Sequence, residues 1–214
     1  MVTAKELKFI KNKYKEPGLY NTIDIESFDK PMNVIIGPNG TGKSMTCKLA
    51  EDYCKKNSIG VYRYTTKSND VVDGCRSAYL DLSPEKLAAA FTSEGERMNY
   101  SFDTWLIENI LPNIKNNDKM YIILDEIDSG LSPDRIWSSL QVVKTMCETE
   151  NEHKHDVRFI ITCNSYELLE FVSLNTDLNI FWMPTTDKVV INSYEDFRKL
   201  YYNYLKEFQK YDKD

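Results

Sequence analysis

One eight-residue stretch constrains the fold of this chain more than any other feature. Residues 37–44 read Gly-Pro-Asn-Gly-Thr-Gly-Lys-Ser and match the pattern G-x-x-x-x-G-K-[ST]. An apolar segment, residues 33–36, precedes the stretch, and a helical pattern follows it from about residue 42 to residue 56. A strand, a glycine-rich turn and a helix in this order let backbone N–H groups surround a phosphate group. The sequence therefore predicts an α/β fold with a phosphate loop after its first strand.

The residue types of this loop suit a triphosphate that is bound together with Mg²⁺. Glycines let the backbone approach phosphate oxygens without a clashing Cβ. Lys43 places a cation at the β- and γ-phosphates, and the Ser44 hydroxyl is a hard oxygen ligand for Mg²⁺. We therefore expect ATP and Mg²⁺ as cofactors, with Ser44 as a metal ligand and Lys43 also acting in catalysis. The residues expected to contact the nucleotide are Gly37, Pro38, Asn39, Gly40, Thr41, Gly42, Lys43, Ser44 and Met45.

A second apolar segment, residues 120–124, ends in two adjacent acids, Asp125 and Glu126. Ligands of α/β proteins bind at the carboxyl ends of the sheet strands. At such an end Asp125 would hold Mg²⁺ directly or through water. Glu126 points the other way along the pleat and would polarise the attacking water, so it is predicted as the general base.

The rest of the chain reads as alternating short strands and longer helices. A helix is expected after Ser132, with Ile136, Leu140 and Val143 on one face, and another from Ser193 onward. The second of these carries an apolar stripe that must pack on the chain's own core or on a partner. No linker is visible, so residues 1–214 are expected to form a single domain with a mostly parallel sheet flanked by helices. The predicted strands are 33–36, 60–65, 120–124, 158–162, 178–183 and 188–191.

The order of the motifs resembles the ABC-type ATPases of the SMC, RecF and OLD-like branch. Residues 125–132 resemble the Walker B strand and D-loop of that family, and residues 92–96 are similar to its degenerate signature. In that family the signature serine and glycine, here Ser93 and Gly95, cap the γ-phosphate bound to the other subunit. The resemblance implies a P-loop NTPase fold with an ABC-type antiparallel β element and a small helical insertion at about 67–115. It also implies an ATP-hydrolysing enzyme that forms a homodimer on ATP.

Residues 158–165 resemble the next strand and switch position of the same family, which carries histidine where this chain has Asn164. An amide can hydrogen-bond a phosphate oxygen or the lytic water, so Asn164 is a predicted catalytic residue. The chain has only two glutamines, Gln141 and Gln209, and neither lies between the phosphate loop and the signature. The Q-loop glutamine of transporter ATPases is therefore missing. The short spacing between Ser44 and Ser93 leaves no room for a long coiled coil.

Three other functions fit parts of the same pattern. An AAA+-type remodelling ATPase would use Asn164 as a sensor, but no arginine lies between Arg158 and Arg198 to serve as a finger. The nucleotide-binding subunit of an ABC transporter would need the missing glutamine and a membrane partner. A nonhydrolytic, nucleotide-gated module is disfavoured because Glu126 is present.

The biological task follows only from the resemblance, which implies DNA repair, recombination or anti-phage defence, with a nuclease or other effector as partner. The net charge of −6 gives no support for direct DNA binding. No apolar run has the roughly 20 residues that a membrane span needs, so we expect a cytoplasmic protein without a membrane partner. The five cysteines show no metal-site spacing and are expected to be reduced thiols.

Overall fold

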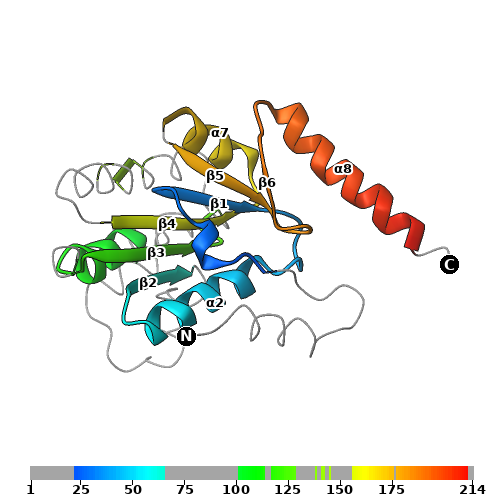
Figure 1. The fold of residues 1–214 in the computed structure, drawn as a ribbon. Coiled ribbons are helices and arrows are strands. Elements are labelled where there is room, and N and C mark those ends of the chain that lie inside the picture. Colours follow the sequence, from blue (N-terminus) through cyan, green and yellow to red (C-terminus); the bar gives the residue numbers. More distant parts are fainter. Residues whose placement is uncertain are drawn as a thin grey trace, which may run out of the picture.

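A six-stranded sheet organises the described part of the chain (Figure 1). The computed structural model describes residues 22–65, 101–113, 117–128, 138, 141–142, 145, 156–175 and 177–211. Each predicted strand is present, with ends that differ by a few residues at most. The strands are β1 (Met32–Ile36), β2 (Gly60–Thr65), β3 (Lys119–Asp125), β4 (Asp156–Cys163), β5 (Leu178–Trp182) and β6 (Asp187–Val189).

The strand order across the sheet is β2-β3-β4-β1-β5-β6. All neighbouring strands run parallel except β5 and β6, which pair antiparallel. The predicted α/β fold with a mostly parallel sheet and an antiparallel element is therefore confirmed. Strand β4 lies between β1 and β3, so the strand before the phosphate loop and the strand that ends in the acids are not direct neighbours.

The three predicted helices agree with the structure over their described residues, whereas η1 (Ile25–Ser27) and α7 (Tyr166–Asn175) were not predicted. Helix α8 begins directly after Ser193, whose hydroxyl accepts the N–H of Asp196 at 3.2 Å, as the capping pattern predicts. Of the helix expected after Ser132, the described residues 138, 141, 142 and 145 are helical, and the other positions lie outside the described residues. The expected insertion at 67–115 is described only over residues 101–113, which begin as a helix. The helices with described bounds are η1 (Ile25–Ser27), α2 (Lys43–Lys56), η2 (Leu106–Ile110), α7 (Tyr166–Asn175) and α8 (Tyr194–Tyr211).

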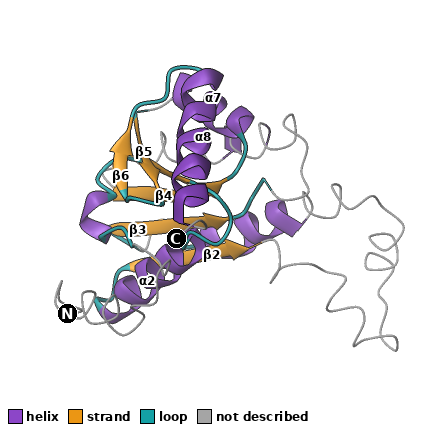
Figure 2. Cartoon of the chain, turned by 90° about the vertical axis from the view of Figure 1, so that its right-hand side faces the viewer, coloured by secondary structure: helices purple, strands orange, loops and turns teal. Residues whose placement is uncertain are grey.

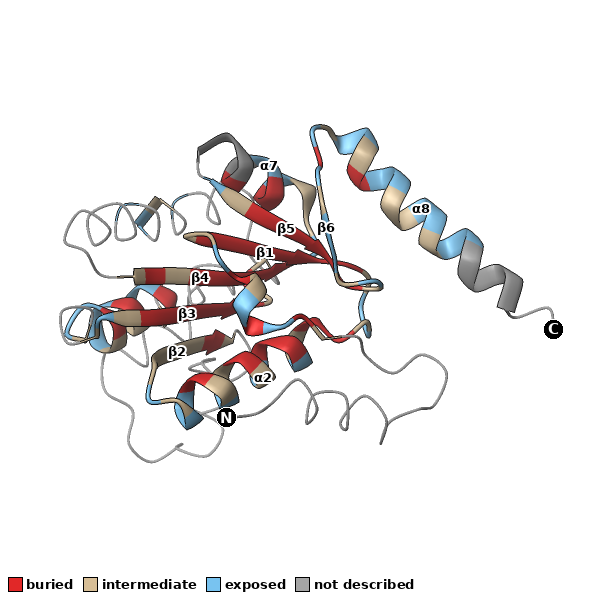
Figure 3. Cartoon of the chain, viewed as in Figure 1, coloured by how far each residue is buried: buried red, intermediate tan, exposed pale blue. Residues whose placement is uncertain are grey.

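Helices lie on both faces of the sheet and give the described part of the chain three layers (Figure 2). Apolar side chains fill the space between these layers. On one face Cys47, Ala50 and Cys54 of α2 pack with residues of η1 against Ile35 and Ile123. On the other face α7, α8 and the helix that contains η2 cover the alternate strand positions. The central strands are therefore buried along nearly their whole length, as Figure 3 shows.

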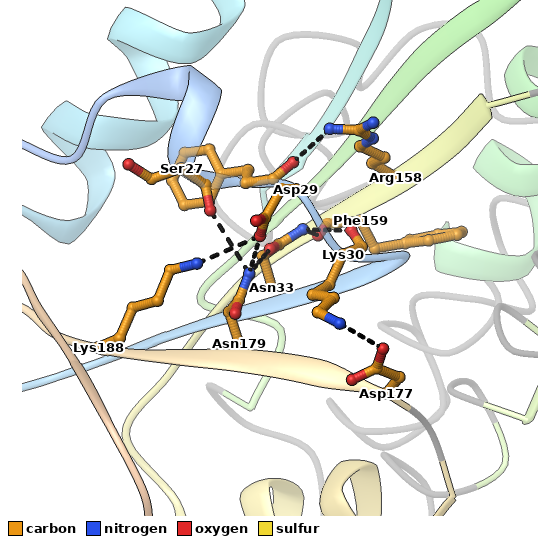
Figure 4. Close-up of polar contacts among 10 residues, drawn as sticks. Ser27, Asp29, Lys30, Asn33, Arg158, Phe159, Asp177, Asn179 and Lys188 are labelled. Carbon is orange, nitrogen blue, oxygen red and sulfur yellow. Dashed lines mark hydrogen bonds and ion pairs between the residues drawn. The ribbon is translucent and has the colours of Figure 1, made fainter.

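A polar network ties the segment before β1 to the amino ends of the central strands (Figure 4). The Asn33 amide donates to the carbonyls of Lys30, at 2.7 Å, and Phe159, at 3.1 Å. Its oxygen accepts the Asn179 amide at 3.0 Å, and Asn179 also donates to Asp29 at 2.6 Å. Asn33 is fully buried, so these bonds satisfy a polar group that would otherwise be costly inside the core.

The apolar stripe of α8 packs on the chain's own core along its first turns. Tyr201 stands edge-on to Trp182 of β5 with ring centroids 5.0 Å apart, and Phe197 contacts Tyr166 of α7 at 5.7 Å. Farther along, Leu205 is exposed, and Figure 1 shows α8 running away from the sheet. No helix in the described part of the chain is long and apolar enough to cross a membrane.

Candidate functional site

The phosphate loop leaves β1 and enters α2 through backbone conformations that favour glycine. Gly42 has a φ of 101° and is the N-cap of α2. Gly37 has a φ of 150°, and a Cβ added there would lie 3.0 Å from Cβ of Met183 and 3.2 Å from Cδ of Pro184. A side chain at either position would therefore strain the loop, which explains why the pattern needs glycine there.

Lys43 is buried at the start of α2 and turns back toward the loop that precedes it. Its ammonium group donates to the carbonyl of Gly37 at 2.6 Å and to that of Pro38 at 3.1 Å. Burial lowers the pKa of Lys43, and the nearby acids Asp128, Glu126 and Asp125 oppose that shift. The loop thus holds a cation beside the N–H groups of a helix N-terminus, which is an arrangement suited to a multiply charged anion.

The two predicted acids lie at the carboxyl end of β3, next to this helix. The hydroxyl of Ser44 donates to Oδ1 of Asp125 at 3.1 Å, although 81 residues separate them in sequence. Thr162 of β4 donates to the same oxygen at 2.8 Å and accepts the backbone N–H of Glu126, also at 2.8 Å. Glu126 itself has a φ of 57°, in the left-handed region that non-glycine residues rarely adopt. The hydroxyl of Thr162 therefore orients the carboxylate of Asp125 and anchors the backbone of Glu126.

An arginine that the sequence analysis did not single out completes the contacts of Asp125. Arg63 on β2 places Nη2 2.6 Å from Oδ2 of Asp125 and Nη1 3.5 Å from Oε2 of Glu51 on α2. Burial is the largest single influence on Arg63 and lowers its pKa, but the hydrogen bond and charge of Asp125, together with the charges of Cys47 and Glu51, outweigh burial, so the pKa of Arg63 is raised. A single charged residue within the aromatic and β-branched segment 60–65 was the available signal. The sequence does not reveal that β2 pairs with β3, and without that pairing Arg63 cannot be assigned to Asp125.

A cavity of about 600 Å³ opens over the loop, the start of α2 and the end of β3. Seven predicted site residues line it together with two cations, Lys48 and Arg63, that were not predicted. Lys48 lies one helical turn beyond Ser44, a spacing that could have identified it. The predicted residues in the lining are Asn39, Gly40, Gly42, Lys43, Ser44, Met45 and Glu126.

Asp128 links the acidic segment to the predicted switch position. Its Oδ2 accepts the backbone N–H groups of Asn164, at 2.6 Å, and of Ser165, at 2.8 Å. Its Oδ1 is buried and has no hydrogen-bond partner among the described residues. Burial raises the pKa of Asp128 in spite of the two backbone donors. The side chain of Asn164 is exposed, and its backbone is held just beyond the end of β4.

The oxygen atoms near Ser44 fit a bound Mg²⁺. The hydroxyl of Ser44 and the carboxylate of Asp125 are hard donors, and they lie side by side. When Ser44 donates its proton to Asp125, a lone pair of its oxygen stays available for a metal ion. The Asp125 side chain is only 4% exposed, so it would reach an ion in the cavity through water or after a shift of Arg63.

Two predicted site residues, Ser93 and Gly95, lie outside the described residues, as do residues 129–132 of the expected D-loop. Gly37, Pro38 and Thr41 belong to the loop beneath the cavity, where the Thr41 hydroxyl donates to the carbonyl of Pro38 at 2.8 Å. The structure thus brings the loop, Asp125 and Glu126 together from distant parts of the sequence.

A search of curated protein sequences found no match. Similar solved structures include a nucleotide-free ATP-binding cassette from an ABC transporter, with a TM-score of 0.41 and 15% identity over 79% of this chain and 83% of that chain. The ATPase domain of G40P has a TM-score of 0.40 and 11% identity over 85% and 83%. A chain of the E. coli MS115-1 HORMA:CdnC:Trip13 complex has a TM-score of 0.37 and 10% identity over 85% and 57%.

The sequence also matches, over residues 33–175, the family described as ATPase family associated with various cellular activities (AAA). That span is more than half of the chain and includes the phosphate loop, both acids and Asn164. The narrower SMC, RecF and OLD-like branch stays a prediction. The chain belongs to the AAA family of ATPases, as a P-loop domain whose loop and acidic strand meet at one edge of the sheet.

Proposed function

We propose that the chain binds ATP with Mg²⁺ in the cavity over residues 37–44 and hydrolyses it. The observation that carries this proposal is the contact between Ser44 and Asp125, with Lys43 and Glu126 lining the same cavity. Family membership supports the same reaction.

Each polar side chain has a separate part in the proposed reaction. Lys43 leaves the carbonyls of Gly37 and Pro38 and contacts phosphate oxygens. There its positive charge neutralises part of the negative charge of the triphosphate. Ser44 and Asp125 hold Mg²⁺, which when bound neutralises charge on the β- and γ-phosphates. Glu126 accepts a proton from the attacking water, and Asn164 hydrogen-bonds that water or a phosphate oxygen.

Calorimetry and phosphate release test the proposal together. Mg·ATP should bind the wild type, and Lys43→Ala should abolish that binding. Glu126→Gln should bind Mg·ATP with similar affinity but release phosphate at least about a hundredfold more slowly, because the general base is lost. Lys30→Ala is the control, since Lys30 pairs with Asp177 at the amino end of the sheet. Binding that survives Lys43→Ala would refute the proposed site.

We also propose that two ATP-bound copies associate and that Ser93 and Gly95 of one copy complete the site of the other. The order of the sequence motifs supports this dimer. Asn39 and Gly40 of the phosphate loop are exposed, so a second copy could reach the loop there. Light scattering of Glu126→Gln with ATP should give twice the mass of the single chain. If the mass stays that of one chain, the sandwich mechanism fails.

A ring-forming remodelling ATPase is the second candidate, and the AAA family match favours it. In that mechanism Asn164, just beyond the end of β4, would act as the sensor asparagine. A mass close to six chains in the same light-scattering experiment would select this function over the dimer.

The proposed downstream role is a switch or motor for DNA repair, recombination or anti-phage defence in the cytoplasm, with a nuclease or other effector as partner. Its support is the resemblance of the motif order alone. Fluorescence anisotropy with labelled duplex DNA, with and without ATP, tests direct binding. A pull-down with ATP-loaded Glu126→Gln tests for the effector. If neither DNA nor a nucleic-acid enzyme is retained, this role is wrong.

A further inference from the structure

Arg63 lines the cavity in which the proposed nucleotide binds and also pairs with the carboxylate of Asp125. The arginine lines the cavity and its side chain is 19% exposed, whereas the Asp125 side chain is 4% exposed and does not belong to the lining. The guanidinium Nη2 lies 2.6 Å from Oδ2 of Asp125. A cation that approaches Oδ2 of Asp125 from the cavity therefore meets Arg63, whereas Oδ1 is contacted by Ser44, which also lines the cavity.

Both carboxylate oxygens of Asp125 already have partners. Oδ1 accepts the hydroxyls of Ser44 and Thr162, and Oδ2 faces Arg63. A divalent ion held by Ser44 and Asp125 would lie near the guanidinium, and two positive groups so close in a partly buried site repel each other. The paired arginine and a metal ion thus compete for the one negative charge of Asp125.

Glu51 is a second carboxylate partner of the Arg63 guanidinium, beside Asp125. Its Oε2 lies 3.5 Å from Nη1 of Arg63, and it comes from α2, about two turns beyond Ser44. A small rotation of the arginine would transfer its ion pair from Asp125 to Glu51. The displaced cation would then stay paired, which keeps the cost of the movement low.

We propose that Arg63 is a positioning residue that acts as the counter-ion of Asp125 and yields that carboxylate to the metal ion by turning to Glu51. This inference rests on the proposed Mg²⁺ site. It implies that Asp125 binds a divalent ion weakly on its own, and that the negative charge of the triphosphate is needed to shift Arg63. Metal and nucleotide would then enter the site together.

A titration of the nucleotide-free protein with Mn²⁺ tests this inference without ATP hydrolysis. The electron paramagnetic resonance signal of the free ion measures how much Mn²⁺ is bound. Arg63→Gln should bind Mn²⁺ about tenfold more tightly than the wild type, a factor usual for two coupled ligands. Arg63→Lys keeps the charge and should bind as weakly as the wild type. Lys48→Gln removes a charge from the same cavity wall, and no described contact joins Lys48 to Asp125, so its gain should be much smaller.

The double variant Arg63→Gln, Asp125→Asn tests whether the gain in Mn²⁺ affinity depends on the carboxylate of Asp125. It should lose the gain that Arg63→Gln shows. Thermal unfolding checks that each variant is folded before its affinity is compared. Equal Mn²⁺ affinity in the wild type and Arg63→Gln, or an equal gain in Lys48→Gln, would overturn the inference. Because these titrations contain no nucleotide, a failure of the wild type to bind Mg·ATP would refute the proposed function separately.

Discussion

The hydroxyl of Thr162 on β4 donates a hydrogen bond to Oδ1 of Asp125 on β3 across 2.8 Å, and it also accepts the N–H of Glu126 at 2.8 Å. One buried hydroxyl from the intervening strand therefore orients the predicted metal ligand and fixes the backbone of the predicted base. Strand β4 contributes to the site through this contact.

Thr162→Val should weaken both the fold and the reaction. It leaves the N–H of Glu126 without its acceptor, so the free energy of unfolding should fall by about 2 kcal/mol. The rate of ATP hydrolysis should fall about tenfold or more because the acids are no longer held. Urea unfolding and phosphate release measure the two effects. Thr46→Val is the matched control, since the buried Thr46 hydroxyl donates to the sulfur of Met183 at 3.7 Å and no contact with either acid is described. A comparable loss of hydrolysis in the control would contradict this role of Thr162.

Glu126→Gly should be more stable than Glu126→Ala by about 1 kcal/mol. The backbone of residue 126 has a φ of 57°, which penalises alanine but not glycine. Both variants remove the carboxylate and should lose hydrolysis equally. Thermal or urea unfolding of the pair measures the backbone effect directly. If alanine proves the more stable of the two, the left-handed conformation is not retained in solution.

Asp128→Asn should change how stability depends on pH. Because burial raises the folded-state pKa of Asp128 above 3.8, the native state binds more protons than the unfolded state between the two values. The contribution of Asp128 to stability therefore falls as pH rises through that window. The asparagine variant lacks this loss, so its stability relative to the wild type should improve from acid pH toward neutral pH. Urea unfolding across that range measures the difference, and a trend of the opposite sign would show that Asp128 is stabilised as an anion.

Asn33→Ala should destabilise the fold by about 1–3 kcal/mol without changing nucleotide affinity. The substitution leaves the carbonyls of Lys30 and Phe159 and the Asn179 amide without the partners seen in Figure 4. Asn33 lies near the amino end of β1, whereas the phosphate loop follows its carboxyl end. Urea unfolding measures the loss of stability, and calorimetry measures the nucleotide affinity. Lys188→Ala, which removes an exposed member of the same network, should cost less than about 1 kcal/mol. An equal cost for both variants would show that burial of Asn33 is not what matters.

Local patterns in the sequence predicted most of the elements and the two halves of the site. Short segments rich in apolar residues and bounded by polar residues predicted all six strands. The signal was clearest for β1, β3, β4 and β5, since strands buried on both faces need nearly continuous apolar side chains. The helix after the phosphate loop and the helix after Ser193 followed from capping and periodicity. Residues 37–44, Asp125 and Glu126 were each recognisable because their residue types are required by local backbone or charge chemistry.

The contacts between those halves could not be predicted, because they depend on which strands are neighbours. Arg63 reaches Asp125 only because β2 pairs with β3, and Thr162 reaches both acids only because β4 is inserted between β1 and β3. Asp128 likewise meets the N–H groups of Asn164 and Ser165 across the same edge of the sheet.

The sequence alone determined that a phosphate loop, an acidic strand end and an α/β fold occur in this chain, because backbone conformation and hydrophobic periodicity act over short distances. Only the tertiary structure decided that an arginine pairs with the predicted metal ligand and that a threonine from a third strand holds the acids. Strand order is set by the packing of the whole core, and no local segment carries that information.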